Sequence, residues 1–356
     1  MVNKSPKELL EVPTAWSITQ VMASMEAALT GDGPALAFGP SKFNSVESEI
    51  AVVIPTSGST GAPKEVALTA NALIASATAA HKFLGGVSGE RWSLKLPTHH
   101  IAGVNVLVRA IALGSNLTEV DFDYTSIVPT QLYRALEGDN ELLASLQSAK
   151  AVLVGGAAVR DDLLEKAHAV GVNVVTTYGM SEMSGGCVYN NEPLDGVEVE
   201  IRENNRIALR GPMQAQSYLG SPLSLADDAG WFLSNDSGYL LNGKLFIDGR
   251  VDDQIISGGE KISLSTIDDF LNQQVLQNKQ GQRFMSCAIE SPEWGEQLCL
   301  ASNGEFDIPT IKGVLEERFG NYAVPKKFLS GIELPTTSIG KADRPTLSQI
   351  FERIQS

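Results

Sequence analysis

Residues 51–64 read AVVIPTSGSTGAPK, an apolar run followed directly by glycines, hydroxyl side chains and a lysine. The apolar run, 51–56, predicts a buried strand. After it, glycines let the backbone fold closely around phosphate oxygens, hydroxyl groups add donors, and Lys64 adds a positive charge. The glycine spacing differs from that of a Walker loop, and Glu65 follows Lys64. The segment therefore predicts a phosphate-binding loop of another kind, and an ordinary glycine- and serine-rich turn is the alternative. The candidate phosphate-binding residues are Thr56, Ser57, Gly58, Ser59, Thr60, Gly61 and Lys64.

Short apolar runs alternate with amphipathic stretches on both sides of this segment. The spacing of apolar residues predicts helices over 14–30, 68–84, 101–113 and 160–170. Strands are predicted over 91–97, 116–122, 151–156 and 173–179. Alternation of this kind favours an α/β domain with a largely parallel sheet.

The pattern changes after Gly179, where VEVEIREN, RIALRGP, GWFLS and GKLFIDG predict short strands between turns. We expect a small antiparallel or barrel-like subdomain there. A second change near residue 252 begins a helix over 264–278, two strands, a helix over 308–319 and an irregular end. The sequence therefore predicts two domains, a large one over 1–251 and a small α+β one over 252–356.

Composition excludes several classes of protein. The chain has 356 residues, 43% of them hydrophobic, and a net charge of −15, which argues against a surface for nucleic acids or anionic membranes. Its three cysteines, Cys187, Cys287 and Cys299, lack metal-ligand spacing and indicate reduced thiols in a cytosolic protein. The first residues lack the apolar stretch of a signal peptide, and no run reaches the length of a membrane span. A cytoplasmic location is expected.

Five further motifs follow the phosphate loop in order, and together they resemble the adenylate-forming superfamily, which includes acyl-CoA synthetases, peptide-synthetase adenylation domains and firefly luciferase. Two departures are Ser181, where the family usually has threonine, and Asn235, where it usually has glycine. The motifs are Gly155-Gly156-Ala157, Tyr178-Gly179-Met180-Ser181-Glu182, Ser234-Asn235-Asp236, Gly249 to Ile255 followed by Gly258-Gly259, and Pro335 through Gly340-Lys341-Ala342-Asp343-Arg344.

The resemblance implies a fold and a two-step reaction. The fold has a large N-terminal α/β domain with a small β-rich subdomain and a mobile C-terminal α+β domain. In the reaction, a carboxylic acid and ATP form an acyl-adenylate, and a thiol, expected to be coenzyme A, then accepts the acyl group. The ATP site implied on the large domain combines the phosphate loop with Gly155, Gly156, Ala157, Tyr178, Gly179 and Ser181.

Individual roles also follow from the resemblance. Glu182 is the implied Mg²⁺ ligand, Asp236 contacts the ribose hydroxyls, and Arg250 contacts the ribose or a phosphate. Lys341 is the implied catalytic lysine that bridges the attacking carboxylate and the α-phosphate, and Asp252 is the hinge about which the small domain turns. The alternatives are an exposed carboxylate for Glu182, turn residues for Asp236 and Arg250, and a surface lysine for Lys341.

The segment LPTHHIAGVNVLVRAI, residues 96–111, resembles the acyl-pocket motif of the superfamily. It supplies His100, as a catalytic or gating residue, and Asn105 and Arg109 as further acyl-site residues. An arginine inside VLVRAIAL is costly to bury without an anion, so a dicarboxylic acid suits it better than a fatty acid. The segment resembles the o-succinylbenzoate–CoA ligases of menaquinone biosynthesis, and the short length of the chain resembles their compact actinobacterial members. A structural histidine, and a helix–helix salt bridge or exposed face for Arg109, are the alternatives.

Other functions remain as alternatives. An aryl- or fatty-acid ligase that loads coenzyme A or a carrier protein would use the same first step, and a degenerate member would bind nucleotide without turnover. A serine hydrolase is disfavoured because Gly179-Met180-Ser181-Glu182-Met183 lacks the second glycine of a nucleophile elbow. A dinucleotide oxidoreductase lacks its glycine fingerprint. LSTID at 264–268 replaces the usual Pro-x-x-Ile-Glu, so the coenzyme A contacts are left open.

Overall fold

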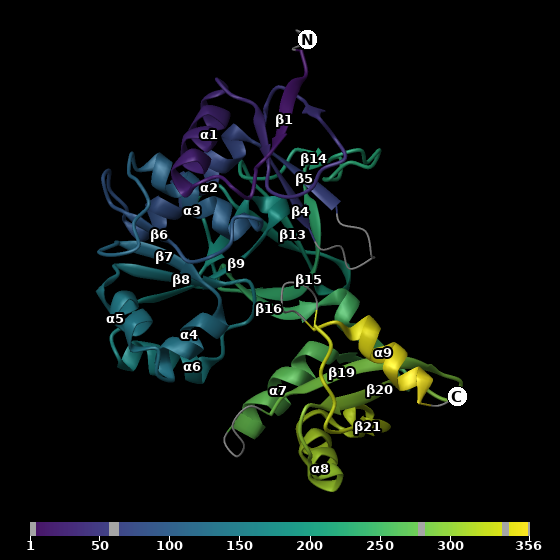
Figure 1. Cartoon of the computed structure of the whole chain (residues 1–356). Helices are drawn as coiled ribbons and strands as arrows, with labels where there is room; N and C mark the ends of the chain where they lie inside the picture. The colour runs from purple at the N-terminus through teal and green to yellow at the C-terminus, as the bar shows by residue number, and fades with distance from the viewer. Residues whose placement is uncertain (1–4, 57–63, 277–281, 337–341, 355–356) are drawn as a thin grey trace. The chain divides into compact units, whose positions relative to one another are not determined.

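The computed structural model describes residues 5–56, 64–276, 282–336 and 342–354 (Figure 1). The chain divides into two compact units. The first comprises Met1–Ile201, Ala208–Ser234 and Leu240–Phe246, and the second comprises Arg202–Ile207, Asn235–Tyr239 and Ile247–Ser356. The domain boundary expected at residue 251 stays a prediction.

The first unit contains a mixed sheet that includes the predicted strand over 51–56. In the described residues its order is β14-β5-β4-β2-β1-β3. The strands β1, β2 and β4 are parallel, whereas β3, β5 and β14 join antiparallel. The bounds are β1 Lys7–Glu11, β2 Ala35–Ala37, β3 Ser45–Val46, β4 Ile50–Thr56, β5 Lys64–Thr69 and β14 Ser217–Tyr218.

A second sheet of this unit supplies the edge on which several motif residues lie. Its order in the described residues is β11-β10-β9-β8-β7-β6. The strands β6 to β9 are parallel, and β10 and β11 are antiparallel, so the expected parallel arrangement is confirmed for β6 to β9. The bounds are β6 Trp92–Leu94, β7 Tyr124–Ile127, β8 Ala151–Gly155, β9 Val174–Met180, β10 Gly185–Tyr189 and β11 Glu192–Pro193.

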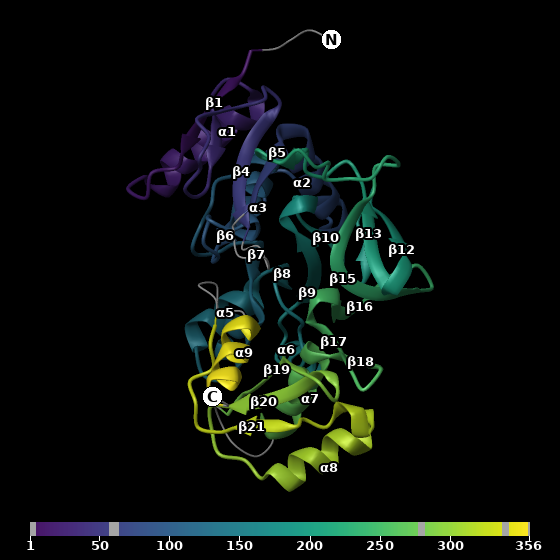
Figure 2. The same cartoon turned by 90° about the vertical axis from the view of Figure 1, so that its right-hand side faces the viewer.

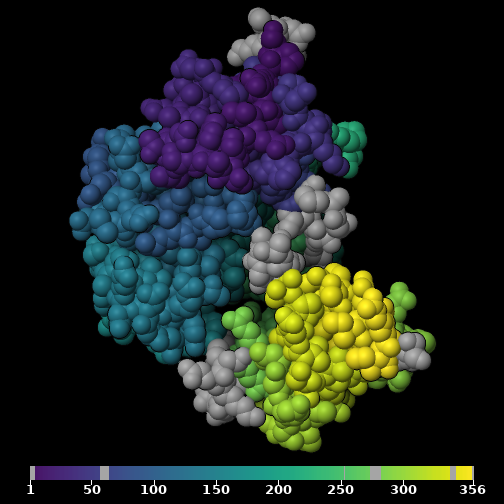
Figure 3. All heavy atoms as spheres, viewed as in Figure 1, coloured from purple at the N-terminus to yellow at the C-terminus, as the bar shows by residue number. Residues whose placement is uncertain are grey.

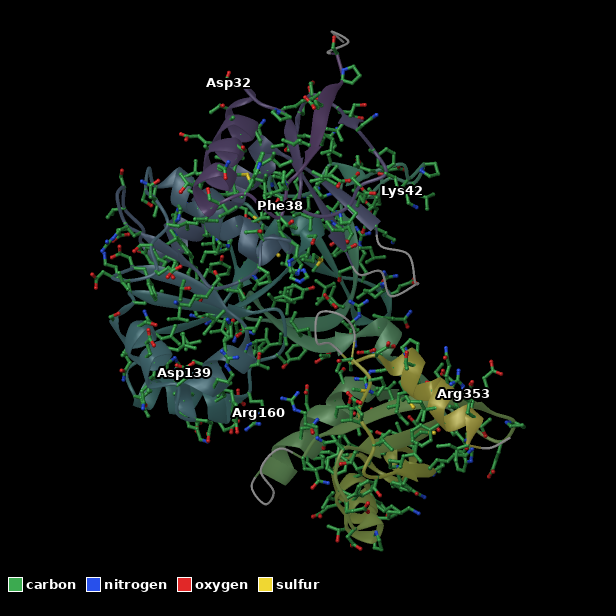
Figure 4. The ribbon with its side chains drawn as sticks, viewed as in Figure 1. Asp32, Phe38, Lys42, Asp139, Arg160 and Arg353 are labelled. Atoms are coloured by element: carbon green, nitrogen blue, oxygen red, sulfur yellow. The ribbon has the colours of Figure 1, made fainter. Side chains whose placement is uncertain are left out.

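Helices of the first unit belong to two apolar cores. Predicted helices are present as α1 Ile18–Thr30, α2 Ala70–Leu84 and α3 Ile101–Ala112, and all three pack with β4. Ile18, in the first turn of α1, is 43% exposed, and Figure 3 shows the N-terminal residues of the chain in purple on the surface of the first unit. A separate core unites β8 with α4 Pro129–Leu136, α5 Asn140–Ser148 and α6 Asp161–Ala169. The helices α4 and α5 were not predicted; Asp139, labelled in Figure 4, caps α5 by accepting from the Leu142 N–H at 3.1 Å.

The strand predicted over 116–122 is wrong, because this segment is a loop. The Thr118 hydroxyl donates to the Val120 carbonyl at 2.6 Å and accepts from the Val120 N–H at 3.3 Å. These local bonds compete with a strand ladder. Asp121 has a φ of 51°, in the left-handed region and far from the φ of regular strands, and Val120 is 69% exposed. The strand of this region, β7, begins only at Tyr124.

The four short strands predicted after Gly179 are present as a sheet with the order β12-β13-β15-β16 in the described residues. Asn242 and Gly243 join the last two strands, and both have positive φ, 52° and 78°, as a tight hairpin turn requires. The bounds are β12 Glu198–Ile201, β13 Arg206–Arg210, β15 Phe232–Leu241 and β16 Lys244–Arg250.

The second unit folds around a sheet with helices on both faces (Figure 2). In the described residues its order is β18-β17-β20-β19, with β21 beside β20. One face packs against α7 and α8, and alternate residues of β19 and β20 face α9. The bounds are β17 Gln254–Ser257, β18 Glu260–Ser263, α7 Leu264–Leu276, β19 Phe284–Ser291, β20 Gly295–Ser302, α8 Ile308–Phe319, β21 Lys327–Leu329 and α9 Arg344–Arg353.

The irregular end predicted for this unit is wrong, because α9 occupies it. Asp343 caps the helix by accepting from the Thr346 N–H at 3.1 Å, and Pro345 stands in its first turn. Leu347 and Phe351, four residues apart, are both buried against the sheet. In the part of the chain that the structure describes, no helix has the length and apolar character needed to span a membrane.

Candidate functional site

Two of the motifs lie where parallel strands end. Gly155 ends β8 and Tyr178 and Gly179 lie near the end of β9, so both motifs lie at the carboxyl edge of the second sheet. Ligands of α/β sheets commonly bind at this edge. Glycine is needed at residue 155, since a Cβ there would lie 2.1 Å from the Thr177 hydroxyl oxygen. Gly156 has a φ of 82°, and Ala157 beside it is exposed.

Glu182 lies immediately beyond β9, in a short 3₁₀ helix over Ser181–Met183. Its Oε1 accepts a hydrogen bond from the Tyr218 hydroxyl at 2.7 Å. Burial raises the pKa of Tyr218 above its usual value, and the Glu182 carboxylate raises it further, so the phenol keeps its proton. The Lys64 ammonium lies 4.8 Å from the centre of the same ring. Tyr218 therefore brings together Lys64 and Glu182, two residues that the sequence predicted for the ATP site.

Sequence reasoning missed Tyr218. It lies on the two-residue strand β14, which pairs with β5.

The two ends of the predicted phosphate loop are held together, since Thr56 is the register partner of Lys64 and the Thr56 hydroxyl donates to the Lys64 carbonyl at 3.2 Å. The predictions for Ser57, Gly58, Ser59, Thr60 and Gly61 fall outside the described residues.

The donors near Glu182 decide whether the implied magnesium ion fits this place. The described residues contain no group of three or more His, Cys, Asp or Glu side chains suited to a metal. Mg²⁺ commonly binds through one or two carboxylates together with substrate phosphates and water. The half-buried Glu182 carboxylate, with Oε1 held by Tyr218, fits an ion that arrives with a nucleotide.

The acyl-pocket motif surrounds α3. His100 is the half-buried residue that precedes the helix, and its ring lies 4.2 Å from that of His99. Asn105 is buried, and its side-chain amide donates to the Ser184 carbonyl at 2.6 Å. A Cβ at Gly185 would lie 2.0 Å from the same amide nitrogen, so Asn105 packs directly on the chain just after Glu182. Their roles toward an acyl substrate stay predictions.

Arg109 is 4% exposed, and its contacts are with neutral groups. One terminal nitrogen donates to the Tyr189 hydroxyl at 2.7 Å, and the other donates to the Ser126 hydroxyl at 3.4 Å. The Trp92 ring lies 5.2 Å from the guanidinium carbon, while Nε has no hydrogen-bond partner. Among the described residues no carboxylate pairs with Arg109, so the helix–helix salt bridge considered from the sequence is not found there.

The pKa shifts of the groups around Arg109 also indicate that its partners are neutral. Burial raises the pKa of Tyr189, so its phenol stays neutral beside the guanidinium. Burial also lowers the pKa of His81 to about 4, with a further lowering by the positive charge of Arg109 and an opposing effect of Glu90. The neutral His81 ring accepts a hydrogen bond from the Trp92 indole at 3.3 Å. The surroundings of Arg109 therefore supply dipoles and a π face in place of a counter-ion.

The second unit holds the remaining predicted residues. Asp236 on β15 and Arg250 at the end of β16 lie together, with 3.9 Å between a carboxylate oxygen and a guanidinium nitrogen. Asp252 belongs to a short 3₁₀ helix, Val251–Asp253. Lys341 lies outside the described residues. Described residues before and after it are hydrogen-bonded to each other: Thr336 pairs with Ala342, and the Asp343 N–H donates to the Pro335 carbonyl at 3.0 Å.

Arg344, the last residue of the lysine motif, forms a buried ion-pair network within this unit. Its Nη1 donates to Asp268 at 2.6 Å and to the Ser286 carbonyl at 2.5 Å, and its Nε donates to Asp253 at 3.3 Å. It therefore connects the start of α9 with α7, β19 and the residue after the predicted hinge. Arg344 belongs to the lysine motif, but the sequence predicted no role for it.

Comparisons with known proteins agree with the motifs. Residues 7–213 match the family described as AMP-binding enzyme. A probable 2-succinylbenzoate–CoA ligase of Mycobacterium tuberculosis (strain H37Rv) is 39% identical over 285 residues, 70% of this chain and 73% of that protein. The 2-succinylbenzoate–CoA ligase of Escherichia coli (strain K12) is 36% identical over 227 residues, 58% of this chain and 49% of that protein.

The fold has a solved counterpart. The o-succinylbenzoate CoA synthetase of Bacillus subtilis, in complex with its acyl-adenylate intermediate, superposes with a TM-score of 0.74 at 22% identity. The match covers 95% of this chain and 82% of the other, which confirms the predicted fold class. The family match covers more than half of the chain, and the mycobacterial relative is 39% identical. The chain therefore belongs to the AMP-binding enzyme family, the adenylate-forming superfamily that its motifs resemble.

Proposed function

We propose that this chain is an AMP-forming ligase that joins 2-succinylbenzoate (o-succinylbenzoate) to coenzyme A, a reaction of menaquinone biosynthesis. The observation that carries the proposal is the buried Arg109 guanidinium, which has no carboxylate partner among the described residues. A buried cation without a counter-ion is costly, and a substrate with a second carboxylate would supply one. The names of the mycobacterial and E. coli relatives support the same substrate.

In the first half-reaction, the substrate carboxylate attacks the α-phosphate of ATP. A bond forms between a carboxylate oxygen and α-phosphorus, and the bond to pyrophosphate breaks. The approach of two anions makes the barrier largely electrostatic. Lys64 lies at the end of the phosphate loop to neutralise phosphate charge, and Lys341 is the residue we assign to the attacking oxygen and the α-phosphate. Glu182 would hold Mg²⁺ together with the nucleotide, and the ion would supply further neutralisation of phosphate charge.

In the second half-reaction, the thiolate of coenzyme A attacks the acyl carbonyl carbon and AMP leaves. We assign the ribose hydroxyls of the nucleotide to Asp236 and Arg250, which lie 3.9 Å apart. Rotation about Asp252 would exchange the orientation that presents Lys341 for the one that admits the thiol. His100 and Asn105 are assigned to the acyl pocket with Arg109. The magnesium ion and the cytoplasmic location remain predictions.

The test of the substrate is pyrophosphate release with MgATP and coenzyme A across a panel of acids. The panel holds 2-succinylbenzoate, benzoate, salicylate, 4-coumarate, octanoate and palmitate. We expect strong release with 2-succinylbenzoate alone. Pyrophosphate release with a monocarboxylate instead would support the adenylation chemistry but reject 2-succinylbenzoate as the substrate. Nucleotide binding without pyrophosphate release for any acid would indicate a non-catalytic member of the family.

The test of the catalytic lysine separates the half-reactions. Lys341→Ala should abolish adenylation, while the variant still transfers the acyl group of added acyl-adenylate to coenzyme A, because that step does not need charge at the α-phosphate. Loss of both half-reactions would contradict this division. A single-turnover comparison of free coenzyme A with a pantetheine-bearing carrier protein distinguishes the two possible acceptors.

A further inference from the structure

One short segment holds Glu182 at two points. The Ala215 N–H donates to the Glu182 carbonyl at 2.8 Å, and the Tyr218 hydroxyl donates to its side chain at 2.7 Å. The segment is fastened in turn to β5, since the Gln216 N–H donates to the Ala67 carbonyl at 3.0 Å. The Leu219 N–H donates to the Glu65 carbonyl at 2.8 Å. The Glu182 carboxylate is therefore attached to the strand that begins at the predicted phosphate loop.

Tyr218 also contacts the lysine at the end of that loop. The Lys64 ammonium lies 4.8 Å from the centre of the Tyr218 ring, within the range of a cation–π interaction. Lys64 is exposed, and among the described residues no carboxylate lies within 4.0 Å of its ammonium. The acid and the base therefore share one aromatic partner and are not paired with each other.

This arrangement leaves both charges available to a nucleotide. A direct ion pair between Lys64 and Glu182 would have to break before either could contact phosphate or metal. A hydrogen bond from a neutral phenol orients the carboxylate without neutralising it, and a ring face attracts an ammonium without removing its donors. Both contacts place the side chains before the ligand arrives, which lowers the ordering cost of binding.

We propose that Tyr218 is a positioning residue for magnesium-bound nucleotide, through its hydroxyl on Glu182 and its ring on Lys64. The inference rests on the proposed function, which assigns Glu182 to the metal and Lys64 to the phosphates. It adds a residue from β14, a strand that belongs to none of the sequence motifs and that pairs with β5.

The experiment removes the hydroxyl and keeps the ring, in Tyr218→Phe. Titration calorimetry measures the dissociation constants of ATP with Mg²⁺ and of AMP without metal, in the full chain and in the absence of acid substrate. We expect Tyr218→Phe to bind MgATP about 10- to 150-fold more weakly, the range for losing one hydrogen bond to a charged group. The affinity for AMP should change less than about twofold, because AMP needs no metal ligand.

A matched control is available in Tyr124→Phe. The Tyr124 hydroxyl also donates to a carboxylate at 2.7 Å, that of Glu90, in the same unit and outside every predicted site residue. This control should leave both affinities unchanged. In a Glu182→Gln background, Tyr218→Phe should add little further loss, since the hydroxyl acts through Glu182.

The outcomes separate the inference from the proposed function. Equal affinity for MgATP in the wild type and Tyr218→Phe would overturn the inference, as would an equal loss of MgATP and AMP binding, which would indicate a merely structural tyrosine. Additive losses in the Glu182→Gln background would overturn the route through Glu182. If the wild type binds no MgATP and releases no pyrophosphate with any acid, the proposed function itself fails.

Discussion

Two arginines of this chain, the buried Arg109 and the largely buried Arg344, have opposite surroundings. Arg344 in the second unit donates to the carboxylates of Asp268 and Asp253. Arg109 in the first unit contacts two hydroxyls and an indole ring, and its Nε has no partner. Both side chains are largely removed from water, so their different partners indicate different roles.

The difference can be understood from the cost of burying charge. A buried cation with carboxylate partners is balanced within the folded chain, and its loss leaves buried anions behind. A buried cation with neutral partners is balanced only when an anion arrives. Arg344 is therefore a structural residue that holds the start of α9 to α7 and β19, whereas the neutral partners of Arg109 support our proposal that it binds a ligand.

The largest effect is expected on removing the paired arginine. Arg344→Ala should lower the free energy of unfolding of the second unit by about 3–5 kcal/mol, because the buried Asp268 and the half-buried Asp253 lose their partner. Denaturant unfolding measures this. The control is Lys82→Ala, which breaks the exposed pair with Asp195 at 2.9 Å and should cost about 0–1 kcal/mol. Equal losses in the two variants would refute the structural role.

The surroundings of Arg109 should also produce a pH dependence. His81 has its pKa lowered to about 4 in the folded chain, against an unfolded value near 6.5. Above pH 6.5 the imidazole is neutral in both states. As the pH falls from 6.5 to 4, the unfolded chain binds a proton that the folded chain does not, and stability falls by about 3 kcal/mol.

The check on this prediction is denaturant unfolding at several pH values in the wild type and in His81→Gln. Glutamine can still accept from the Trp92 indole, so the variant should lack this part of the pH dependence. Arg109→Met should reduce the loss, because the positive charge of Arg109 is one cause of the lowered pKa. Identical pH profiles for the wild type and His81→Gln would show that His81 does not titrate as described.

A smaller effect is expected at Tyr189, the closest partner of Arg109. Tyr189→Phe should cost about 1–3 kcal/mol of unfolding free energy, since it leaves one more guanidinium donor without a partner. Adding Arg109→Met should restore part of that stability, because replacing both partners by apolar groups removes the unsatisfied charge. A double variant less stable than Tyr189→Phe alone would mean that Arg109 supports the fold and would weaken the comparison with Arg344.

The sequence predicted candidate motif residues and most helices and strands, but not the side-chain contacts between distant segments. Strand–helix alternation predicted β4, β8, β9 and the helices α2 and α3. The strand over 116–122 failed because the Thr118 hydroxyl bonds locally. Tyr218 and Tyr189 could not be assigned, since each reaches its partner through sheet pairing or packing between distant segments, which no local pattern records.

The central claim is that Arg109 binds the second carboxylate of 2-succinylbenzoate, and matched substrates test it most directly. Two analogues each lack one carboxylate: 4-oxo-4-phenylbutanoate lacks that of the ring, and 2-butanoylbenzoate lacks that of the chain. The analogue that still releases pyrophosphate identifies the activated carboxylate. The ratio of kcat/KM for 2-succinylbenzoate to kcat/KM for this analogue is then measured in the wild type and in Arg109→Met. We predict a fall in the ratio of about 10- to 150-fold in the variant, with the analogue unaffected. An equal loss for both substrates, or no loss for either, would contradict the account.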